Sequence, residues 1–382
     1  MLFDYETLKL IWWLLVGVLF IGFALTDGFD MGVGALLRYV GKTDEERRVA
    51  INTIAPHWDG NQVWLILAAG AIFAAWPITF GASFSSFYWA LVLTLFSLFF
   101  RPVGFDYRSK LANPKWRNAW DWGLVAAGVI PPLVFGIAFG NLLLGVAFEF
   151  DEFLRISTHG SFFGLFHPFA ILVGLVSLSM FTMQGASYLM LRTDDVIYAR
   201  ARKAAYWAAA SVLITFALAG IWLWLGVTGY AITQMPATDA LPNPLAKTVV
   251  PMDGAWLANY RTYPLTIIAP VAGFLGAFGV LILAKRDKAH PVASFLYSSL
   301  SLIGIIMTAG VSLFPFIMPS KLNPSHSLTI WDSASSHLTL NIMFWAALIF
   351  VPIILIYTLW CYKQMWGTVT VKFIQDNEHN VY

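Results

Sequence analysis

Apolar residues occur along the chain in nine long runs that are separated by short polar segments. The runs cover residues 8–37, 57–76, 83–105, 120–147, 166–191, 204–230, 264–284, 292–318 and 338–362. A helix needs about 20 apolar residues to cross a hydrocarbon core of ~30 Å. A membrane barrel would instead show alternating segments of about ten residues. The pattern therefore predicts an all-α, polytopic membrane protein with nine transmembrane helices.

Basic residues are distributed unequally between the segments that join these runs. If the N-terminus lies outside, eighteen of the 23 Lys and Arg residues fall on the inside and five on the outside. Lys and Arg are enriched in cytoplasmic loops, and one missed span would invert every later loop. We therefore expect a periplasmic N-terminus and a cytoplasmic C-terminus. Two outside segments, 149–164 and 230–263, are long enough to fold.

Composition supports the membrane interpretation and excludes several classes of site. The chain is 59% hydrophobic and 12% charged, whereas a soluble domain carries about twice that share of charge. The single cysteine, Cys361, excludes an intrachain disulfide and a four-cysteine metal centre. No phosphate-binding loop or dinucleotide fingerprint is present, and no basic soluble surface suggests a nucleic-acid partner. We expect one transmembrane unit over residues 1–382.

The first candidate site lies in the last third of the first run. Asp27 and Asp30 are three residues apart and would share one face of a helix. A charged side chain inside a span is unfavourable by a few kcal/mol, so such acids usually face a bundle interior or a hydrated cavity. The acids therefore indicate a proton or ion path, or else a structural cluster of interhelical hydrogen bonds.

Two further polar groups lie at the same membrane level. The string Pro56-His57-Trp58-Asp59-Gly60-Asn61-Gln62 opens the second run, where proline and aspartate are also ordinary helix-start residues. Arg101 ends the third run and could neutralise one of the acids, or could extend to lipid phosphates. The functional and the structural interpretations both remain open for these groups.

A fourth group, Trp331-Asp332-Ser333-Ala334-Ser335-Ser336-His337, precedes the last run on the outside. Its Ser and Asp residues are typical of a helix cap, and a contact with a quinone head or a partner is the alternative. A histidine could ligate a haem iron, but all seven histidines lie in loops or at the ends of runs. His57 and His167 come closest to a ligand position, but the pattern argues against haem ligation by this chain.

A faint internal repeat relates the first and fifth runs. Thr26-Asp27-Gly28 and Met183-Gln184-Gly185 each lie about ten residues before a basic loop. This spacing is compatible with two four-helix units followed by a ninth helix.

Several longer strings match those of a known family. They are Ile11-Trp12-Trp13-Leu14, the run from Asp27 to Gly34, Ala55-Pro56-His57-Trp58-Asp59-Gly60-Asn61, Ser97-Leu98-Phe99-Phe100-Arg101-Pro102, Met318-Pro319-Ser320 and Trp331-Asp332-Ser333. On these strings, which extend over essentially the whole chain, the sequence resembles subunit II of the bacterial cytochrome bd-type ubiquinol oxidases in their longer, proteobacterial form.

The resemblance implies a fold, a set of partners and a location. The expected fold has two four-helix bundles, about 8–147 and 166–318, and an extra helix at 338–362. Subunit I would carry haems b and d and the quinol-oxidation loop, so this chain would ligate no cofactor, although some members hold a structural quinone here. Expected partners are subunit I, small single-span accessory subunits, membrane lipids and quinone, in the bacterial cytoplasmic (inner) membrane.

The resemblance also implies a function. The family complex reduces O₂ to water with electrons from quinol, and it generates a proton gradient without pumping. Its protons enter through the cytoplasmic part of subunit II. Matched by motif, the residues here are Asp59, with Asp27, Asp30 and Arg101 nearby, and His57 in the same string as Asp59.

Two other functions compete with the oxidase interpretation. A secondary transporter or channel would also carry acids in its helices, but usually at mid-bilayer and in repeated halves. A purely structural scaffold for subunit I would leave the acids dispensable.

Overall fold

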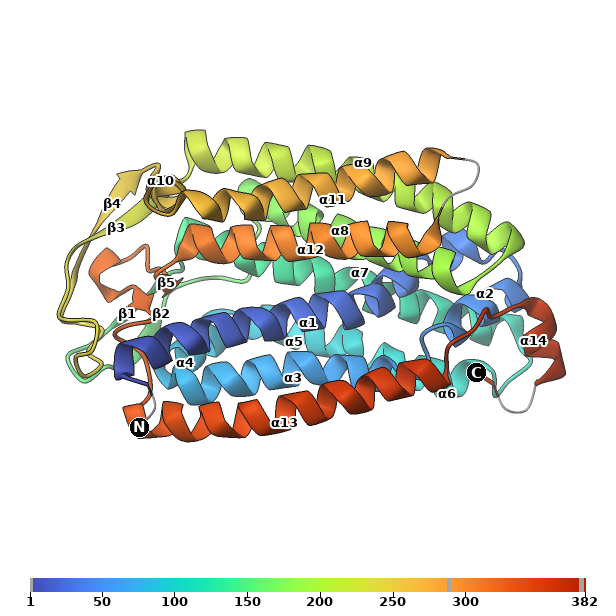
Figure 1. The fold of residues 1–382 in the computed structure, drawn as a ribbon, viewed down its shortest axis with the longest axis horizontal. Helices are drawn as coiled ribbons and strands as arrows, with labels where there is room; N and C mark the ends of the chain where they lie inside the picture. Colours follow the sequence, from blue (N-terminus) through green and yellow to red (C-terminus); the bar gives the residue numbers. More distant parts are fainter. Residues whose placement is uncertain (1–2, 287–289, 378–380) are drawn as a thin grey trace.

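A computed structural model describes residues 3–286, 290–377 and 381–382, and these residues form a bundle of long helices that run roughly parallel to one another (Figure 1). The first part of the chain forms α1 (Tyr5–Val40), α2 (Asp44–Asn52), α3 (Trp58–Ala75), α4 (Pro77–Ser86), α5 (Tyr88–Leu98), α6 (Phe100–Arg108) and α7 (Pro114–Leu144). The second part forms α8 (Pro168–Arg192), α9 (Asp195–Gly226), α10 (Ala258–Thr262), α11 (Ile268–Lys285), α12 (Pro291–Leu313), α13 (His337–Gln364) and α14 (Val371–Asp376).

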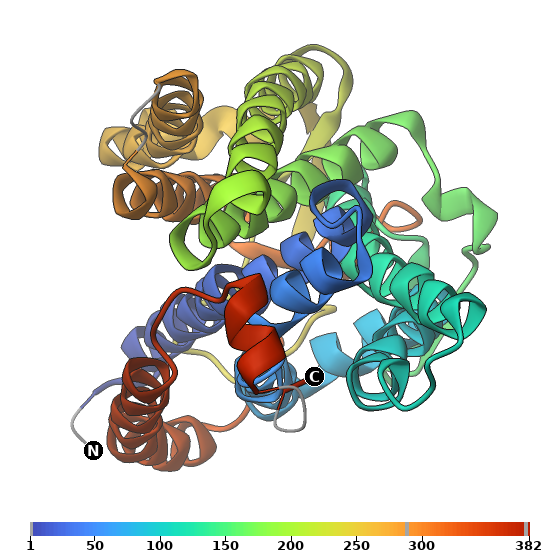
Figure 2. The ribbon, with the colours of Figure 1, turned by 90° about the vertical axis from the view of Figure 1, so that its right-hand side faces the viewer.

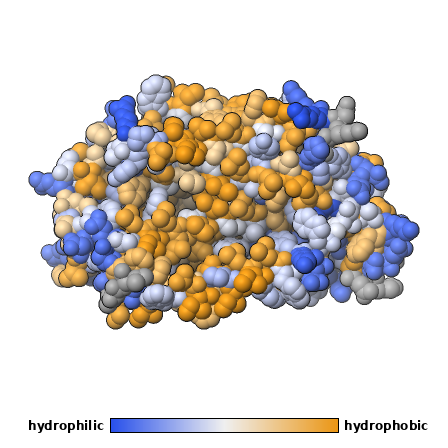
Figure 3. All heavy atoms as spheres, in the orientation of Figure 1, coloured by the Kyte–Doolittle hydropathy of each residue, from blue (hydrophilic) through white to orange (hydrophobic). Residues whose placement is uncertain are grey.

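The bundle has two chemically different ends. At one end, which we call the hairpin end, antiparallel pairs join β1 (Phe148–Phe150) to β2 (Ile156–Thr158), β3 (Thr228–Gln234) to β4 (Thr248–Asp253), and β5 (Phe316–Met318) to β6 (Leu328–Thr329). The other end carries α2, α6, α14 and the basic loops, and we call it the basic end (Figure 1). Hydrophobic side chains form a broad band between the two ends (Figure 3).

Among the described residues, eight helices are long and apolar enough to cross a membrane. They correspond to eight of the nine predicted spans. The remaining predicted span, 57–76, coincides with α3, which has 18 residues and runs alongside α1 and α13 (Figure 1). Its first turn carries Asp59, Asn61 and Gln62, which lower its apolar character. The number nine therefore stays a prediction.

Proline positions explain two differences from the predicted boundaries. The predicted span 83–105 is divided, because α5 ends at Leu98 and α6 begins at Phe100. The ring of Pro102 would meet the carbonyl group of Leu98 in a continuous helix. The predicted span 292–318 ends early, at Leu313, because Pro315 disfavours helical backbone at the residue before it. Residues Phe316–Met318 form β5 instead.

The two predicted folding segments outside the spans both contain hairpins. Segment 149–164 contains most of the β1–β2 pair, and segment 230–263 contains most of the β3–β4 pair. The helices α2 and α14 were not predicted, because each has fewer than ten residues and too few apolar positions to stand out.

Helices from the two parts of the chain meet along α1 and α8. Viewed onto the basic end, α8, α9, α11 and α12 gather on one side of the bundle, and α3 to α7 lie on the other (Figure 2). At the crossing, a Cβ atom on Gly32 would lie 2.0 Å from the carbonyl oxygen of Phe181 and 2.8 Å from the Cα atom of Gly185. Small residues at this level are what allow the two backbones to touch.

The crossing yields a stability prediction. The variant G32A places a methyl group against backbone atoms, so we expect the protein to lose at least about 1–3 kcal/mol of stability. Gly17 in the same helix has no atom within 4 Å of an added Cβ, so G17A is the matched control and should melt at or above the wild-type temperature. Thermal melting of the detergent-purified protein measures both. Equal melting of G32A and G17A would show that the crossing is not tightly packed.

Candidate functional site

Both acids of the first candidate site are buried at the basic end of α1. Asp27 and Asp30 have 0% and 1% of their surface exposed. Arg101, in the first turn of α6, donates from Nη1 to Asp27 Oδ1 at 2.7 Å, and it is itself buried. Of the acids that Arg101 was expected to neutralise, the structure pairs it with Asp27. The break between α5 and α6 is what directs this arginine into the bundle.

Asp30 is held by a hydrogen-bonded chain across three helices. Asn61, on α3, donates from Nδ2 to Asp30 Oδ2 at 2.8 Å. The Oδ1 atom of Asn61 accepts a short hydrogen bond from the hydroxyl group of Tyr362, near the end of α13. Nothing in the sequence pointed to Tyr362, because a tyrosine beside a lysine at a span end is an ordinary interfacial residue.

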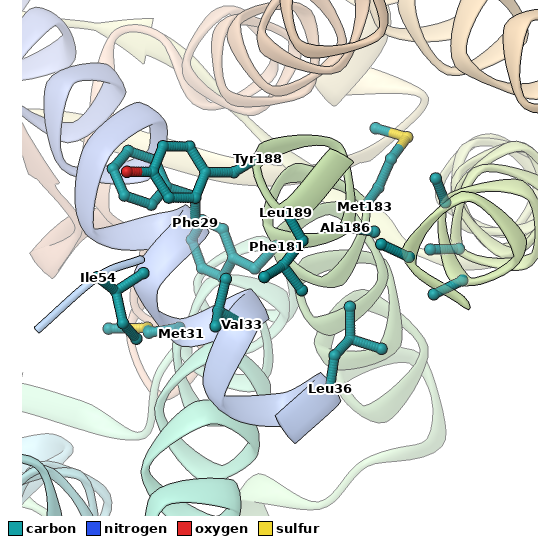
Figure 4. Close-up of a cluster of buried hydrophobic side chains, with 14 of the residues drawn as sticks. Phe29, Met31, Val33, Leu36, Ile54, Phe181, Met183, Ala186, Tyr188 and Leu189 are labelled. Carbon is teal, nitrogen blue, oxygen red and sulfur yellow. The ribbon is translucent and has the colours of Figure 1, made fainter. Parts of the chain in front are cut away.

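His57 joins the cluster through α8. The Tyr188 hydroxyl donates to the carbonyl oxygen of Thr53 at 3.0 Å, and it lies 3.2 Å from Nε2 of His57. Since the hydroxyl has one proton to donate, Nε2 is the donor in the second contact. The ring of Tyr188 stacks on Phe29 with a centroid separation of 3.9 Å, as Figure 4 shows. His57 therefore borders the face of α1 that carries the acids.

Asp59 lies outside this buried polar cluster. It occupies the first turn of α3 and its side chain is exposed at the surface of the chain. No hydrogen bond or ion pair links it to another residue in the described ranges. The structure thus brings Asp27, Asp30, Arg101 and His57 together and places Asp59 at the surface nearby.

Unsatisfied polar atoms accompany a small cavity in the cluster. Asp27 Oδ2, Asp30 Oδ1 and Arg101 Nη2 are buried without a hydrogen-bond partner. Asp30 and Arg101 line a cavity of about 10 Å³ together with Ile54, Phe105 and other apolar side chains. This is close to the space that one water molecule needs, and the site has polar groups to bind it. The cluster therefore has unused hydrogen-bonding groups beside this cavity.

The repeat noted in the sequence corresponds to a contact. Gln184 on α8 donates from Nε2 to the Leu25 carbonyl oxygen at 3.3 Å and to Ser299 Oγ at 3.1 Å. Its neighbour Gly185 packs against Gly32 of α1. Gln184 and Gly185 therefore contact α1 on either side of the string Thr26-Asp27-Gly28.

A second set of ion pairs joins three helices at the basic end. Asp121, at the start of the fourth predicted span, accepts from Arg108 Nε at 2.6 Å and from Arg47 Nη1 at 2.8 Å. Asp44 accepts from Arg108 and Arg117. Sequence reasoning missed Asp121, although an acid at the edge of an apolar run was a usable signal. These pairs tie α2, α6 and α7 together beneath the polar cluster.

On the hairpin end, Asp332 belongs to an ion pair and not to a helix cap. Its Oδ2 lies 2.8 Å from Lys247 Nζ, and its Oδ1 accepts a hydrogen bond from the backbone N–H of Thr329 at 3.0 Å. Burial lowers the pKa of Lys247, and the charge of Asp332 opposes this effect. The cap of α13 is Ser336, whose Oγ accepts from the N–H of Thr339.

The described residues contain no group of three or more His, Cys, Asp or Glu side chains that could hold a metal ion. His57 uses Nε2 in its contact with Tyr188, and its Nδ1 is buried without a partner. His167 Nδ1 accepts from the N–H of Phe169. The larger groove, about 310 Å³ beside Trp89, Phe96 and Phe162, is lined by side chains that do not ligate iron.

The buried pair predicts a particular pattern of stability. R101Q removes the cation and leaves Asp27 buried and unpaired, so we expect a loss of about 3–5 kcal/mol. The double variant D27N/R101Q contains two neutral amides and should recover most of that loss. Thermal melting of both variants beside wild type tests this, and a double variant no more stable than R101Q would contradict it.

Comparison with known proteins agrees with this architecture. The family model described as cytochrome bd terminal oxidase subunit II matches residues 8–365. The chain is 53% identical to cytochrome bd-I ubiquinol oxidase subunit 2 of Escherichia coli K12, over 99% of this chain and all of the relative. It is 50% identical to a probable cytochrome oxidase subunit 2 of Haemophilus influenzae, again over 99% of this chain and all of the relative.

A solved structure has the same fold. A chain of the bd oxidase from Geobacillus thermodenitrificans superposes with a TM-score of 0.68 at 17% identity, covering 94% of this chain and 98% of that chain. The resemblance found in the sequence is confirmed by the family match and by the full-length relatives. With eight apolar helices, this is a multi-pass protein of the inner membrane. The chain belongs to the cytochrome bd terminal oxidase subunit II family.

Proposed function

We propose that this chain acts as subunit II of a bd-type quinol oxidase and conducts cytoplasmic protons toward the site of O₂ reduction in subunit I. The observation that carries the proposal is the pair of buried acids, Asp27 and Asp30, at the basic end of the bundle. Similarity to a ubiquinol oxidase subunit supports the substrate class. Protons taken from the cytoplasm for the four-electron reduction to water would build a gradient without pumping.

The orientation in the membrane is part of the proposal. We assign nine spans, with α3 as the one beyond the eight most apolar helices, two four-helix bundles and α13 as the extra helix. The first and last described residues lie at opposite ends of the bundle, which an odd number of crossings requires (Figure 1). The basic end would face the cytoplasm, since eighteen of the 23 Lys and Arg residues fall on that side.

Each residue of the proposed path has a role that its position permits. Asp59, exposed on α3, would take up protons at the surface. Asp30 would hold them inside the bundle, beside the small cavity that it lines with Arg101. Arg101 would hold Asp27 in an ion pair, and His57 would border the path through Tyr188. Acids at one end of the bundle suit delivery to a neighbouring chain better than transport across mid-bilayer.

The remaining redox parts would belong to other chains. Haems b and d would be held by subunit I, as the family resemblance implies. Small single-span subunits, lipids and a structural quinone are further proposed partners. Within α13 only Leu340 is buried inside this chain, so most of the apolar surface of this helix is available for contacts of this kind.

The proposed path makes Asp59 the first residue to test. D59N should slow quinol oxidase turnover of the complex by roughly tenfold or more while leaving its haem content intact, because an amide carries no titrating proton. D106N is the matched control, since Asp106 is an exposed acid at the same end. Oxygen consumption and proton uptake measure the effect. Wild-type values for D59N in both assays would favour the scaffold role.

The division of cofactors predicts a spectroscopic difference. This chain purified without subunit I should show no haem absorption, whereas the complex should show it. The physical reason is that neither the cavity beside Asp30 nor the groove beside Trp89 is lined by a His, Met, Cys or Tyr side chain. A visible spectrum of each preparation decides the matter, and stoichiometric haem on the isolated chain would disprove the assignment.

A further inference from the structure

Arg38 and Lys42 are two cations at the basic end that the proposed path does not use. Arg38 lies in the last turn of α1, and Lys42 follows shortly after the end of this helix. Within residues 3–286, 290–377 and 381–382, no ion pair joins either side chain to a carboxylate. Lys42 is exposed and Arg38 is partly exposed. Both charges can therefore be reached from outside the bundle.

Contacts with α7 hold the guanidinium of Arg38 in one orientation. Its Nη1 donates a short hydrogen bond to Oδ1 of Asn118, and its central carbon lies 4.6 Å from the ring centre of Trp122. Lys42 Nζ donates to the backbone carbonyl oxygen of Arg38 at 3.2 Å, which keeps the two cations side by side. In the described part of the chain, Nε and Nη2 of Arg38 and two N–H groups of Lys42 remain available as donors.

The packing of α1 against α7 keeps the two sides of this group together. A Cβ atom on Gly128 would lie 2.3 Å from the backbone nitrogen of Ala35 and 2.5 Å from the carbonyl oxygen of Met31. A residue without a side chain is what allows the two backbones to touch here. Ala35 lies one turn before Arg38, so the helices that carry Arg38 and Trp122 cannot move apart without losing this contact.

Exposed aromatic residues accompany the two cations. Trp122 and Tyr39 have 56% and 39% of their surface exposed, and Lys42 Nζ lies 5.6 Å from the ring centre of Tyr39. The first apolar run ends at residue 37 and the fourth begins at residue 120, so the group lies where apolar runs meet polar segments. Trp and Tyr at such a boundary are typical of the headgroup region of a bilayer, where Arg and Lys side chains extend to the phosphates.

The neighbouring acids are already engaged by other arginines. The ion pairs join Asp121 to Arg47 and Arg108, Asp44 to Arg108 and Arg117, and Glu46 to Arg200. Glu45, in the first turn of α2, is exposed and contacts neither Arg38 nor Lys42 in the described ranges. The charge that complements these two cations must therefore come from outside this part of the chain.

We propose that Arg38 and Lys42, beside Trp122, bind the phosphate group of an anionic phospholipid. The guanidinium donates to two phosphate oxygens as a fork, and the ammonium group donates to the third. The acyl chains follow the partly exposed residues Ala126 and Val129, which share the face of α7 that carries Trp122. Two cations favour a headgroup of net negative charge, since a zwitterionic headgroup brings a positive charge with its phosphate.

The inference goes beyond the proton path and rests on the orientation proposed above, in which the basic end meets the cytoplasmic leaflet. The test measures lipid binding to the intact, detergent-purified oxidase complex. Native mass spectrometry follows the binding of phosphatidylglycerol, with phosphatidylcholine of the same acyl chains as the zwitterionic probe. Phosphatidylglycerol should bind more tightly to the wild type, and equal binding of the two lipids would overturn the proposal.

A double variant removes the two cations. R38Q/K42Q should weaken the tightest phosphatidylglycerol binding by about tenfold or more, because two charge-assisted contacts to the phosphate are lost. K110Q/K115Q is the matched control, since it removes the same charge from exposed lysines between α6 and α7, and it should weaken this binding much less. An equal loss in both variants would reveal only diffuse attraction to the charged surface and would overturn the site.

A second variant keeps both charges and removes the ring beneath the guanidinium. W122A should weaken phosphatidylglycerol binding several-fold, because Arg38 is no longer held in place by the ring. W207A is the matched control, since Trp207 on α9 is 62% exposed and, among the described residues, no cation lies over its ring. This variant keeps the proposal testable if haem content shows that R38Q/K42Q does not assemble, and wild-type affinity in W122A would contradict the preformed site.

A competitor without acyl chains distinguishes a lipid from a soluble phosphate. Glycerol 1-phosphate at the concentration of the lipid should not displace phosphatidylglycerol, because the chains contribute much of the binding energy. Displacement would identify a site for soluble phosphate and overturn the lipid assignment. The readout is lipid binding and not turnover, so failure here leaves the proton path untouched, and D59N tests that path separately.

Discussion

Two carboxylates buried one turn apart on α1 determine what the neighbouring helices must provide. Asp27 requires a cation, and the helix break before Pro102 places Arg101 against it. Asp30 requires a hydrogen-bond donor, and the first turn of α3 supplies Asn61. Gly28 and Gly32 alternate with the acids and let α8 approach closely. The arrangement of the basic end follows from satisfying these two groups out of water.

The sequence was sufficient to predict the long helices and the helix face that Asp27 and Asp30 share. Long apolar runs and a three-residue spacing are local properties, so the helices and the burial of Asp27 with Asp30 could be predicted from them. Which polar residue of the string around Asp59 points inward could not be predicted, because Asn61 and Asp59 are two residues apart on a helix whose rotation depends on its neighbours. The structure turned Asn61 inward and Asp59 outward.

The partners of the cluster were beyond sequence reasoning for a different reason. Tyr188 meets His57 across 131 residues and Tyr362 meets Asn61 across 301, so no spacing rule links them. Each is an unremarkable aromatic residue near a span end. Pro102 and Pro315 did carry a readable signal, since both predict where a helix must stop. Family resemblance pointed to the string around Asp59, but only the structure separates the surface residues of this string from its interior ones.

The link from Tyr362 through Asn61 to Asp30 has a consequence for direction. A side-chain amide donates and accepts hydrogen bonds but neither gains nor loses a proton near neutral pH. Asn61 would therefore interrupt proton transfer along the chain of hydrogen bonds from Tyr362 to Asp30. In the proposed path, protons would therefore not pass from Tyr362 to Asp30 through Asn61, and they would reach Asp30 from the cavity that it lines with Arg101. The helix α13 can thus help to hold Asp30 in place, through Asn61, without offering protons a route to this acid from the exposed surface of α13.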